Sequence, residues 1–238
     1  MKKILIIGLI VLAVFLIYLS NLDKKVYYLA LGDSLANGQS TGKKVKSYSD
    51  YVRDYLKEQN LLETYINEYA ENGYRTTDLI KAIKDNKKIT RNKKEITLQN
   101  ALIKADLVTI SIGANDILTK INEKITYDEI YNYIDDLTDD IDELFKLMRE
   151  YCKEDIVLVG YYNPYIESKE TSDIFDYLND SYKEISKKYK IIYVEIDLLF
   201  RENPDFLPST NDIHPSKAGY KAIAGQIIGS VNKTLLKS

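Results

Sequence analysis

The sequence is poor in the residues that build disulfides and metal sites. Its 238 residues include one cysteine, Cys152, and one histidine, His214. A single cysteine excludes an internal disulfide, and one cysteine with one histidine cannot form a Cys/His metal cluster. We interpret Cys152 as a small buried apolar side chain. If the protein uses a histidine as a general base, His214 is the only candidate.

The chain also lacks tryptophan and any long block of charge of one sign. Its 33 basic and 36 acidic residues are interspersed and give a net charge of -3. Without a basic patch, binding of nucleic acid is not expected. The hydrophobic fraction of 45% and the charged fraction of 29% are ordinary for a globular domain. We predict one domain at residues 26–238, which is long enough for one sizeable core.

One uninterrupted apolar run stands at the N-terminus, from Ile4 to Leu19, directly after Lys2 and Lys3. It is slightly shorter than the ~20 residues that usually span a membrane and longer than the apolar part of a typical signal peptide. No clear small-residue cleavage site precedes Asp23. We therefore expect residues 1–22 to form an uncleaved membrane anchor rather than a removed signal. The two lysines favour a cytoplasmic N-terminus, so the domain would lie outside the cytoplasm, or be secreted if the segment is cleaved.

From residue 26 onward, short apolar runs alternate with helical patterns. Buried parallel strands read as nearly continuous apolar runs. Five runs are predicted to be strands, the second of them the weakest: Val26–Leu31, Thr64–Tyr69, Asp106–Ile112, Ile156–Tyr161 and Ile191–Ile196. Helices are predicted at residues 47–59, 76–84, 127–151, 171–189 and 216–235, and a polar surface loop at residues 85–95. This alternation indicates a three-layer, doubly wound α/β sandwich with a parallel sheet of about five strands.

Three of the predicted strands are followed by small, polar, turn-forming residues, at positions 32–38, 71–77 and 113–117. Because sites in doubly wound sheets form at the carboxyl ends of strands, we expect these segments to meet. Ser34 would be exposed on a strand-to-helix turn. Its backbone N–H, that of Gly73 and the side chain of Asn115 could stabilise an oxyanion. We interpret Asp33 and Asp116 as structural acceptors for turn amides.

Together these segments resemble the GDSL, or SGNH, hydrolases, a family of esterases, lipases, lysophospholipases and carbohydrate O-acetylesterases. Gly-Asp-Ser-Leu at 32–35, Gly73, Gly-Ala-Asn-Asp at 113–116 and His-Pro at 214–215 match its four blocks in order. The resemblance runs from about Val26 to the C-terminus. It implies the flavodoxin-like SGNH fold, Ser34 as nucleophile, His214 as base, and an oxyanion hole made by Ser34, Gly73 and Asn115, with no metal or cofactor.

The sequence departs from the family at the acidic residue that orients the catalytic histidine. The family usually places an aspartate three residues before the histidine, where this chain has Asn211, and Asp212 stands only two before it. Asp212 could reach His214 through an altered turn, Asn211 could orient the imidazole through its carbonyl oxygen, or a backbone carbonyl could do so. A carboxylate stabilises the imidazolium better than an amide, so we favour Asp212.

The resemblance implies a serine ester hydrolase that works through a Ser34 acyl-enzyme. A membrane anchor favours a lipid acyl ester or lysophospholipid as substrate, and the membrane as a partner. An outward-facing domain also suits O-acetyl groups on carbohydrate or cell wall, because the fold does not choose the substrate. A noncatalytic module that binds glycan or lipid is a further alternative. Such a module would be expected to lose the serine or the histidine, and this chain has both.

Overall fold

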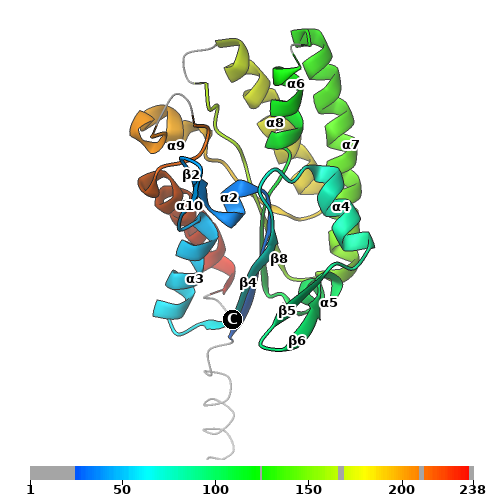
Figure 1. Ribbon diagram of the computed structural model, residues 1–238, viewed down its shortest axis with the longest axis vertical. Coiled ribbons are helices and arrows are strands. Elements are labelled where there is room, and N and C mark those ends of the chain that lie inside the picture. Colours follow the sequence, from blue (N-terminus) through cyan, green and yellow to red (C-terminus); the bar gives the residue numbers. More distant parts are fainter. Residues whose placement is uncertain (1–24, 124, 166–168, 209–211, 236–238) are drawn as a thin grey trace, which may run out of the picture.

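The computed structural model describes residues 25–123, 125–165, 169–208 and 212–235 (Figure 1). The membrane anchor predicted at residues 1–22 lies outside these residues. Within the described ranges, no helix combines the length and the apolar character needed to cross a membrane.

The centre of the protein is a sheet of five parallel strands in the order β4-β1-β7-β8-β9. The predicted parallel sheet of about five strands is therefore confirmed. Two of the three inner strands, β1 and β7, are buried along their whole length, which explains their nearly continuous apolar sequences. In spatial order the strands are β4 (Leu62–Ala70), β1 (Val26–Gly32), β7 (Leu107–Ser111), β8 (Asp155–Val159) and β9 (Ile192–Val194).

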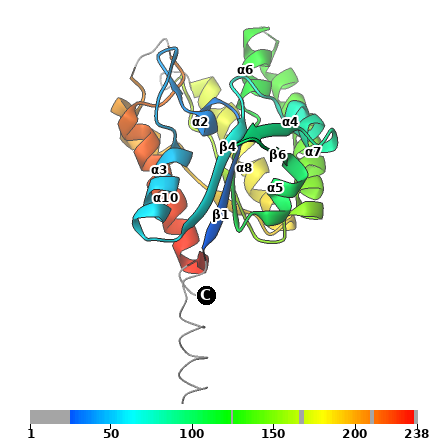
Figure 2. The ribbon, with the colours of Figure 1, turned by 60° about the horizontal axis from the view of Figure 1, so that its bottom comes forward.

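Helices cover both faces of the sheet, which gives the three predicted layers (Figure 2). One face carries α3 (Tyr48–Glu58) and α10 (Lys217–Leu235), which pack against each other. The other carries α4 (Thr76–Lys84), α5 (Leu98–Lys104), α7 (Tyr127–Tyr151) and α8 (Lys169–Lys188). The longest helix, α7, occupies the predicted range and buries one apolar stripe: Ile130, Ile134, Leu137, Ile141, Leu144, Phe145 and Met148.

The prediction of a surface loop at residues 85–95 is wrong. This part of the chain contributes to a hairpin of β5 (Lys88–Arg91) and β6 (Lys94–Thr97). Its two turn residues, Asn92 and Lys93, both have positive φ, as a tight two-residue hairpin turn requires. Ile89 pairs with Ile96, and both side chains pack against the core, so two apolar residues in a polar segment fix the hairpin.

Shorter elements complete the described chain. A second hairpin, β2 (Gln39–Ser40) with β3 (Lys43–Lys44), follows the four-residue helix α2 (Ser34–Asn37). Helix α6 (Ala114–Asn122) follows β7, and α9 (Asp197–Glu202) follows β9. A single 3₁₀ turn, Pro204–Phe206, comes after α9.

The strand order places a topological switch point between β1 and β7. The chain leaves β1 toward β4 on one side and then returns to β7 on the other side. Ligand sites of open α/β sheets lie at the carboxyl ends of strands at such a point. Here those ends lead directly into α2 and α6, the elements that carry Ser34 and Asn115.

Candidate active site

Ser34 is the first residue of α2, on a sharp turn that only a glycine permits. Gly32 has a φ of +115°, and a Cβ at this position would lie 1.9 Å from the carbonyl oxygen of Ser111. The next residue, Asp33, donates its backbone N–H to that same oxygen at 2.9 Å. Its carboxylate Oδ1 accepts the backbone N–H of Leu35 at 3.0 Å and so caps α2.

The predicted exposure of Ser34 is wrong, since only 8% of the residue is accessible. The apolar side chains around it cover the turn, and Ser34 instead lines a small cavity together with His214 and Asn115. Asp33 fulfils the predicted role of an acceptor for turn amides, and so does Asp116, which accepts the backbone N–H of Thr76 at 3.1 Å.

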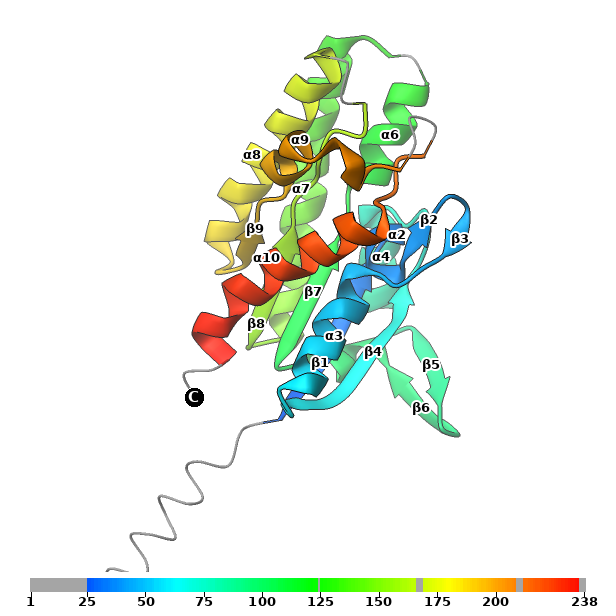
Figure 3. The same ribbon diagram turned by 90° about the vertical axis from the view of Figure 1, so that its left-hand side faces the viewer.

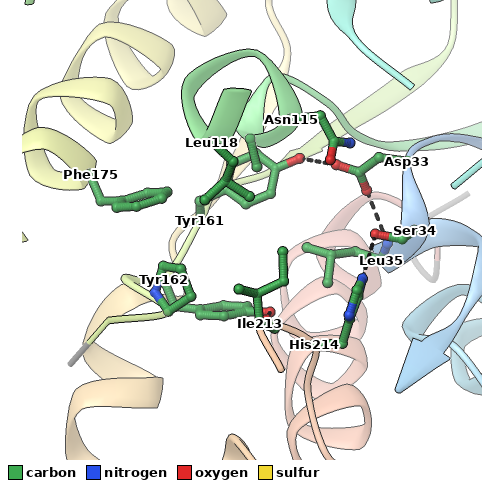
Figure 4. Close-up of a pocket in the computed structure, with 12 residues that line it drawn as sticks. Asp33, Ser34, Leu35, Asn115, Leu118, Tyr161, Tyr162, Phe175, Ile213 and His214 are labelled. Carbon is green, nitrogen blue, oxygen red and sulfur yellow. Dashed lines mark hydrogen bonds between the residues drawn. The ribbon is translucent and has the colours of Figure 1, made fainter. Parts of the chain in front are cut away.

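The structure brings Ser34 and His214 together although 180 positions separate them in the chain. His214 Nε2 lies 2.9 Å from Ser34 Oγ (Figure 4). On the other side of the ring, His214 Nδ1 lies 2.6 Å from Asp212 Oδ1. The side chains of His214 and Asp212 are 13% and 15% exposed, so solvent screens this contact only weakly. A nucleophile, a base and an orienting carboxylate in this order form a serine hydrolase triad by geometry.

The spacing of two residues between Asp212 and His214 is accommodated by a local turn. Asp212 Oδ1 accepts a hydrogen bond from the backbone N–H of His214 at 3.1 Å. The same oxygen contacts the ring nitrogen Nδ1 of His214. A side chain that bonds the N–H two residues ahead forms an Asx turn. Of the three sequence alternatives, the structure therefore shows Asp212 beside the imidazole, whereas Asn211 lies outside the described residues.

The surroundings of Asp212 favour its charged form. Partial burial raises the pKa of Asp212, but hydrogen bonds from the ring and backbone of His214 and from the backbone N–H of Thr41 outweigh it and bring the pKa below its usual value. At neutral pH the carboxylate is therefore ionised. It can fix the Nδ1–H tautomer of His214 and stabilise the imidazolium.

Asn115 and Gly73 occupy different positions relative to the cavity. Asn115 lines it, and its side-chain Nδ2 donates one hydrogen bond to the carbonyl oxygen of Tyr74 at 2.9 Å. An amide group has two N–H donors, so one remains for a ligand. Gly73, in the turn between β4 and α4, has a φ of +80° and is not among the residues that line the cavity.

Sequence reasoning missed a buried polar cluster beneath the nucleophile. The carboxylate of Asp33 accepts hydrogen bonds from the hydroxyls of Tyr161 and Ser111, the latter at 2.8 Å. Burial raises the pKa of Asp33, and its three hydrogen bonds oppose that effect. Ser111 ends β7, and Tyr161 follows β8, so the rule that strand ends carry the site could have found both.

The cavity is small and mostly apolar. Its volume is about 30 Å³, and Figure 4 shows Phe175 at the end remote from Ser34 and His214. None of the described residues that line it is a lysine or arginine. Such a cavity suits an uncharged hydrocarbon group better than a carboxylate or phosphate. The apolar and aromatic walls are Leu35, Ala114, Leu118, Tyr161, Tyr162, Pro164, Phe175 and Ile213.

Metal ligands and reactive thiols are not gathered in the described part of the chain. Within it, no three His, Cys, Asp or Glu side chains are placed to hold a metal ion. Cys152 is fully buried, in agreement with the interpretation from sequence, and burial raises the pKa of its thiol.

Known proteins resemble this chain in fold or in sequence. The lipase Lip_vut3 from a goat rumen metagenome aligns with 87% of this chain and 98% of its own, with a TM-score of 0.74 and 20% identity. The acetylxylan esterase Axe2 of Geobacillus stearothermophilus aligns with 87% and 94%, with a TM-score of 0.67 and 21% identity. The uncharacterized protein YpmR of Bacillus subtilis is 25% identical over 216 residues, which cover 86% of this chain and 80% of YpmR. Residues 30–222 match the GDSL-like lipase/acylhydrolase family, so the chain belongs to that family and is a carboxylic ester hydrolase.

Proposed function

We propose that the protein hydrolyses esters through an acyl-enzyme on Ser34. The observation that carries the proposal is the 2.9 Å contact of Ser34 Oγ with His214 Nε2, backed by Asp212 at 2.6 Å from Nδ1. Ser34 Oγ attacks the ester carbonyl carbon while His214 Nε2 takes the hydroxyl proton. His214 then gives this proton to the leaving alcohol, and Ser34 keeps the acyl group. Water activated by His214 cleaves the acyl-enzyme and releases the acid.

The oxyanion of the tetrahedral intermediates needs donors aimed at one point. We assign the second side-chain N–H of Asn115 to this role, because the first already donates to the carbonyl oxygen of Tyr74. The backbone N–H groups of Ser34 and Gly73 supply the other two donors in this proposal. Ser34 N–H lies at the start of α2, which suits the stabilisation of negative charge.

For the substrate, we propose an ester with an apolar acyl group, and a lipid acyl ester or lysophospholipid in first place. The apolar cavity wall from Leu118 to Phe175 supports the apolar acyl group. The uncharged run at residues 4–19 supports a location at a membrane, with the domain on the extracytoplasmic side. A tethered enzyme of this kind would meet its lipid substrate at high local concentration.

A second candidate is the O-acetyl ester of a carbohydrate, and the small size of the cavity favours it. A volume of about 30 Å³ suits a two-carbon acyl group better than a long chain. The likeness in fold to the acetylxylan esterase Axe2 is consistent with this candidate but does not distinguish it.

Hydrolysis of p-nitrophenyl esters with acyl chains of two to twelve carbons tests both parts of the proposal. We expect the full chain in detergent micelles to hydrolyse at least one ester. Ser34→Ala and His214→Ala should each lower kcat by roughly 10⁴- to 10⁶-fold. A two-carbon optimum would favour the acetyl ester, and a longer optimum the lipid ester.

Phe175→Ala should move the optimum toward longer chains, because Phe175 lines the cavity at the end remote from Ser34. Phe145→Ala, a buried phenylalanine of α7 that does not line the cavity, is the matched control and should leave the optimum in place. A folded protein that hydrolyses no ester in the series would contradict the assignment of this substrate class.

A further inference from the structure

The β2–β3 hairpin connects the active site to α10 through hydrogen bonds that the family motifs do not include. Asp212 Oδ1 is occupied by the backbone and ring of His214. The other oxygen, Oδ2, accepts the backbone N–H of Thr41, which lies at the tip of the hairpin. Both oxygens of the Asp212 carboxylate therefore accept hydrogen bonds. The donors to Oδ1 belong to the neighbouring His214, and the donor to Oδ2 belongs to a segment far away in the sequence.

The hairpin tip has a backbone conformation that needs outside support. Thr41 has a φ of +47°, and the following Gly42 has a φ of +71°. A β-branched residue rarely adopts this region and persists there only where its surroundings hold it. In this conformation the Thr41 N–H donates to Asp212.

Tyr220 provides that support from the other side. This tyrosine is fully buried in the first turn of α10. Its hydroxyl donates to the carbonyl oxygen of Gln39 at 2.6 Å and accepts the backbone N–H of Gln39 at 3.1 Å. Figure 3 shows β2 close to the start of α10, on the same side of the molecule as α2. The Tyr220 hydroxyl thus fixes both the N–H and the carbonyl group of Gln39, which lies two positions before Thr41.

We propose that Tyr220 is a positioning residue of the active site, which acts through Gln39 and the Thr41 N–H to hold the Asp212 carboxylate against His214. The proposal rests on the triad role assigned above to Asp212.

The unusual spacing of the acid explains why such support is needed. An Asx turn fixes one oxygen of Asp212, but the terminal torsion of an aspartate side chain has a broad energy minimum. A donor on the second oxygen restricts this torsion and keeps Oδ1 aimed at Nδ1. Positioning of this kind acts on the rate of the chemical step rather than on binding of the ester.

Tyr220→Phe tests the proposal, with Tyr69→Phe as the matched control. Tyr69 is also buried, and its hydroxyl donates one hydrogen bond to the other hairpin, to the carbonyl oxygen of Ile96 at 2.7 Å. We expect Tyr220→Phe to lower kcat about tenfold with KM within twofold of the wild type. Tyr69→Phe should leave both constants unchanged at a similar loss of thermal stability.

A spectroscopic readout separates this proposal from the proposed function. Because His214 is the only histidine, its Nδ1–H proton gives a single histidine ring signal by NMR without further assignment. Tyr220→Phe should shift or broaden this signal, and Tyr69→Phe should not. If the wild type hydrolyses no ester but the signal responds in this way, the proposed function fails and the coupling of Tyr220 to Asp212 stands.

Substitutions at the exposed tip avoid any effect on the core. Thr41→Gly retains the N–H and accepts a positive φ, so it should keep at least half of the wild-type kcat. Thr41→Pro removes the N–H and cannot adopt this φ, so it should lower kcat at least as much as Tyr220→Phe. The proposal is overturned if Tyr220→Phe and Thr41→Pro both retain the wild-type kcat and the wild-type Nδ1–H signal.

Discussion

The side-chain amide of Asn115 donates a hydrogen bond to the carbonyl oxygen of Tyr74 at 2.9 Å, which joins the start of α6 to the turn after β4. The next residue of α6, Asp116, accepts the backbone N–H of Thr76, the first residue of α4, at 3.1 Å. Two consecutive residues thus hold the turn that contains Gly73. Two of the three proposed donors of the oxyanion hole, Gly73 and Asn115, therefore lie in segments that hydrogen bonds hold together.

Asn115→Ala should lower kcat by about 10²- to 10³-fold and change KM little, because the lost N–H acts on the charge that develops in the transition state. Steady-state kinetics on the best p-nitrophenyl ester measure this effect. Asn100→Ala, at an exposed position of α5, is the control and should keep the wild-type kcat. An unchanged kcat in Asn115→Ala would remove Asn115 from the oxyanion hole.

Asp212 and Asn211 can be distinguished by substituting each in turn. Asp212→Asn should lower kcat by up to about 10⁴-fold, because an amide can leave the imidazole in the wrong tautomer. Asn211→Ala should retain most of the wild-type kcat. The reverse pattern, a large loss in Asn211→Ala and a small one in Asp212→Asn, would assign the orienting role to Asn211.

Asp116 makes the stability of the protein depend on pH. Burial raises the pKa of Asp116 to about 6, against the hydrogen bonds from Thr76 and the charge of Arg75, which lower it. Between pH 4 and 6 the folded state then binds more protons than the unfolded state, so the free energy of unfolding falls as pH rises. Relative to Asp116→Asn, the wild type should lose about 1–3 kcal/mol between pH 4 and 7.

Urea denaturation of the wild type and Asp116→Asn at several pH values measures this difference. The free energies of unfolding of the two proteins should be similar at low pH. The wild type should become less stable than Asp116→Asn as pH rises toward 7. Parallel curves over this whole range would mean that Asp116 does not titrate there.

Gly32→Ala should unfold or strongly destabilise the protein, by about 3 kcal/mol or more, because the added Cβ meets a backbone oxygen that cannot move aside. Gly42→Ala is the control, since Gly42 also has a positive φ but has no atom within 4 Å of the added Cβ. It should cost about 1 kcal/mol. Thermal melts compare the two, and equal losses would show that φ alone, and not the contact with Ser111, makes Gly32 necessary.

Patterns of apolar residues that extend over a whole helix or strand made most of the fold predictable from sequence. Helices α4 and α7 lie at the predicted residues, because each combines an amphipathic stripe with capping residues at its start. The buried strands were predictable from their apolar runs, although β9 is shorter than expected, with only Ile192–Val194. The elements that were missed are short: α2, α5, α6, α9, the 3₁₀ turn and the two hairpins. A few residues carry too little periodicity to identify such elements.

The candidate site was predictable where it depends on motifs and not where it depends on tertiary contacts. Ser34, His214 and Asn115 stand in blocks that the sequence displays, and the structure places all three on one cavity. Their catalytic roles stay predictions until variants are measured. The choice between Asp212 and Asn211 depended on the geometry of one turn. Tyr220 carries no local signal, because its partner Gln39 lies 181 positions away.

Covalent labelling of the full chain with a fluorophosphonate probe, followed by peptide mass spectrometry, tests the central claim most directly. The probe reacts with a serine only where a neighbouring base activates the hydroxyl. We predict a single adduct on Ser34 that is abolished in His214→Ala. An adduct on another residue, or none in a protein that hydrolyses esters, would contradict the assignment of Ser34 as the nucleophile.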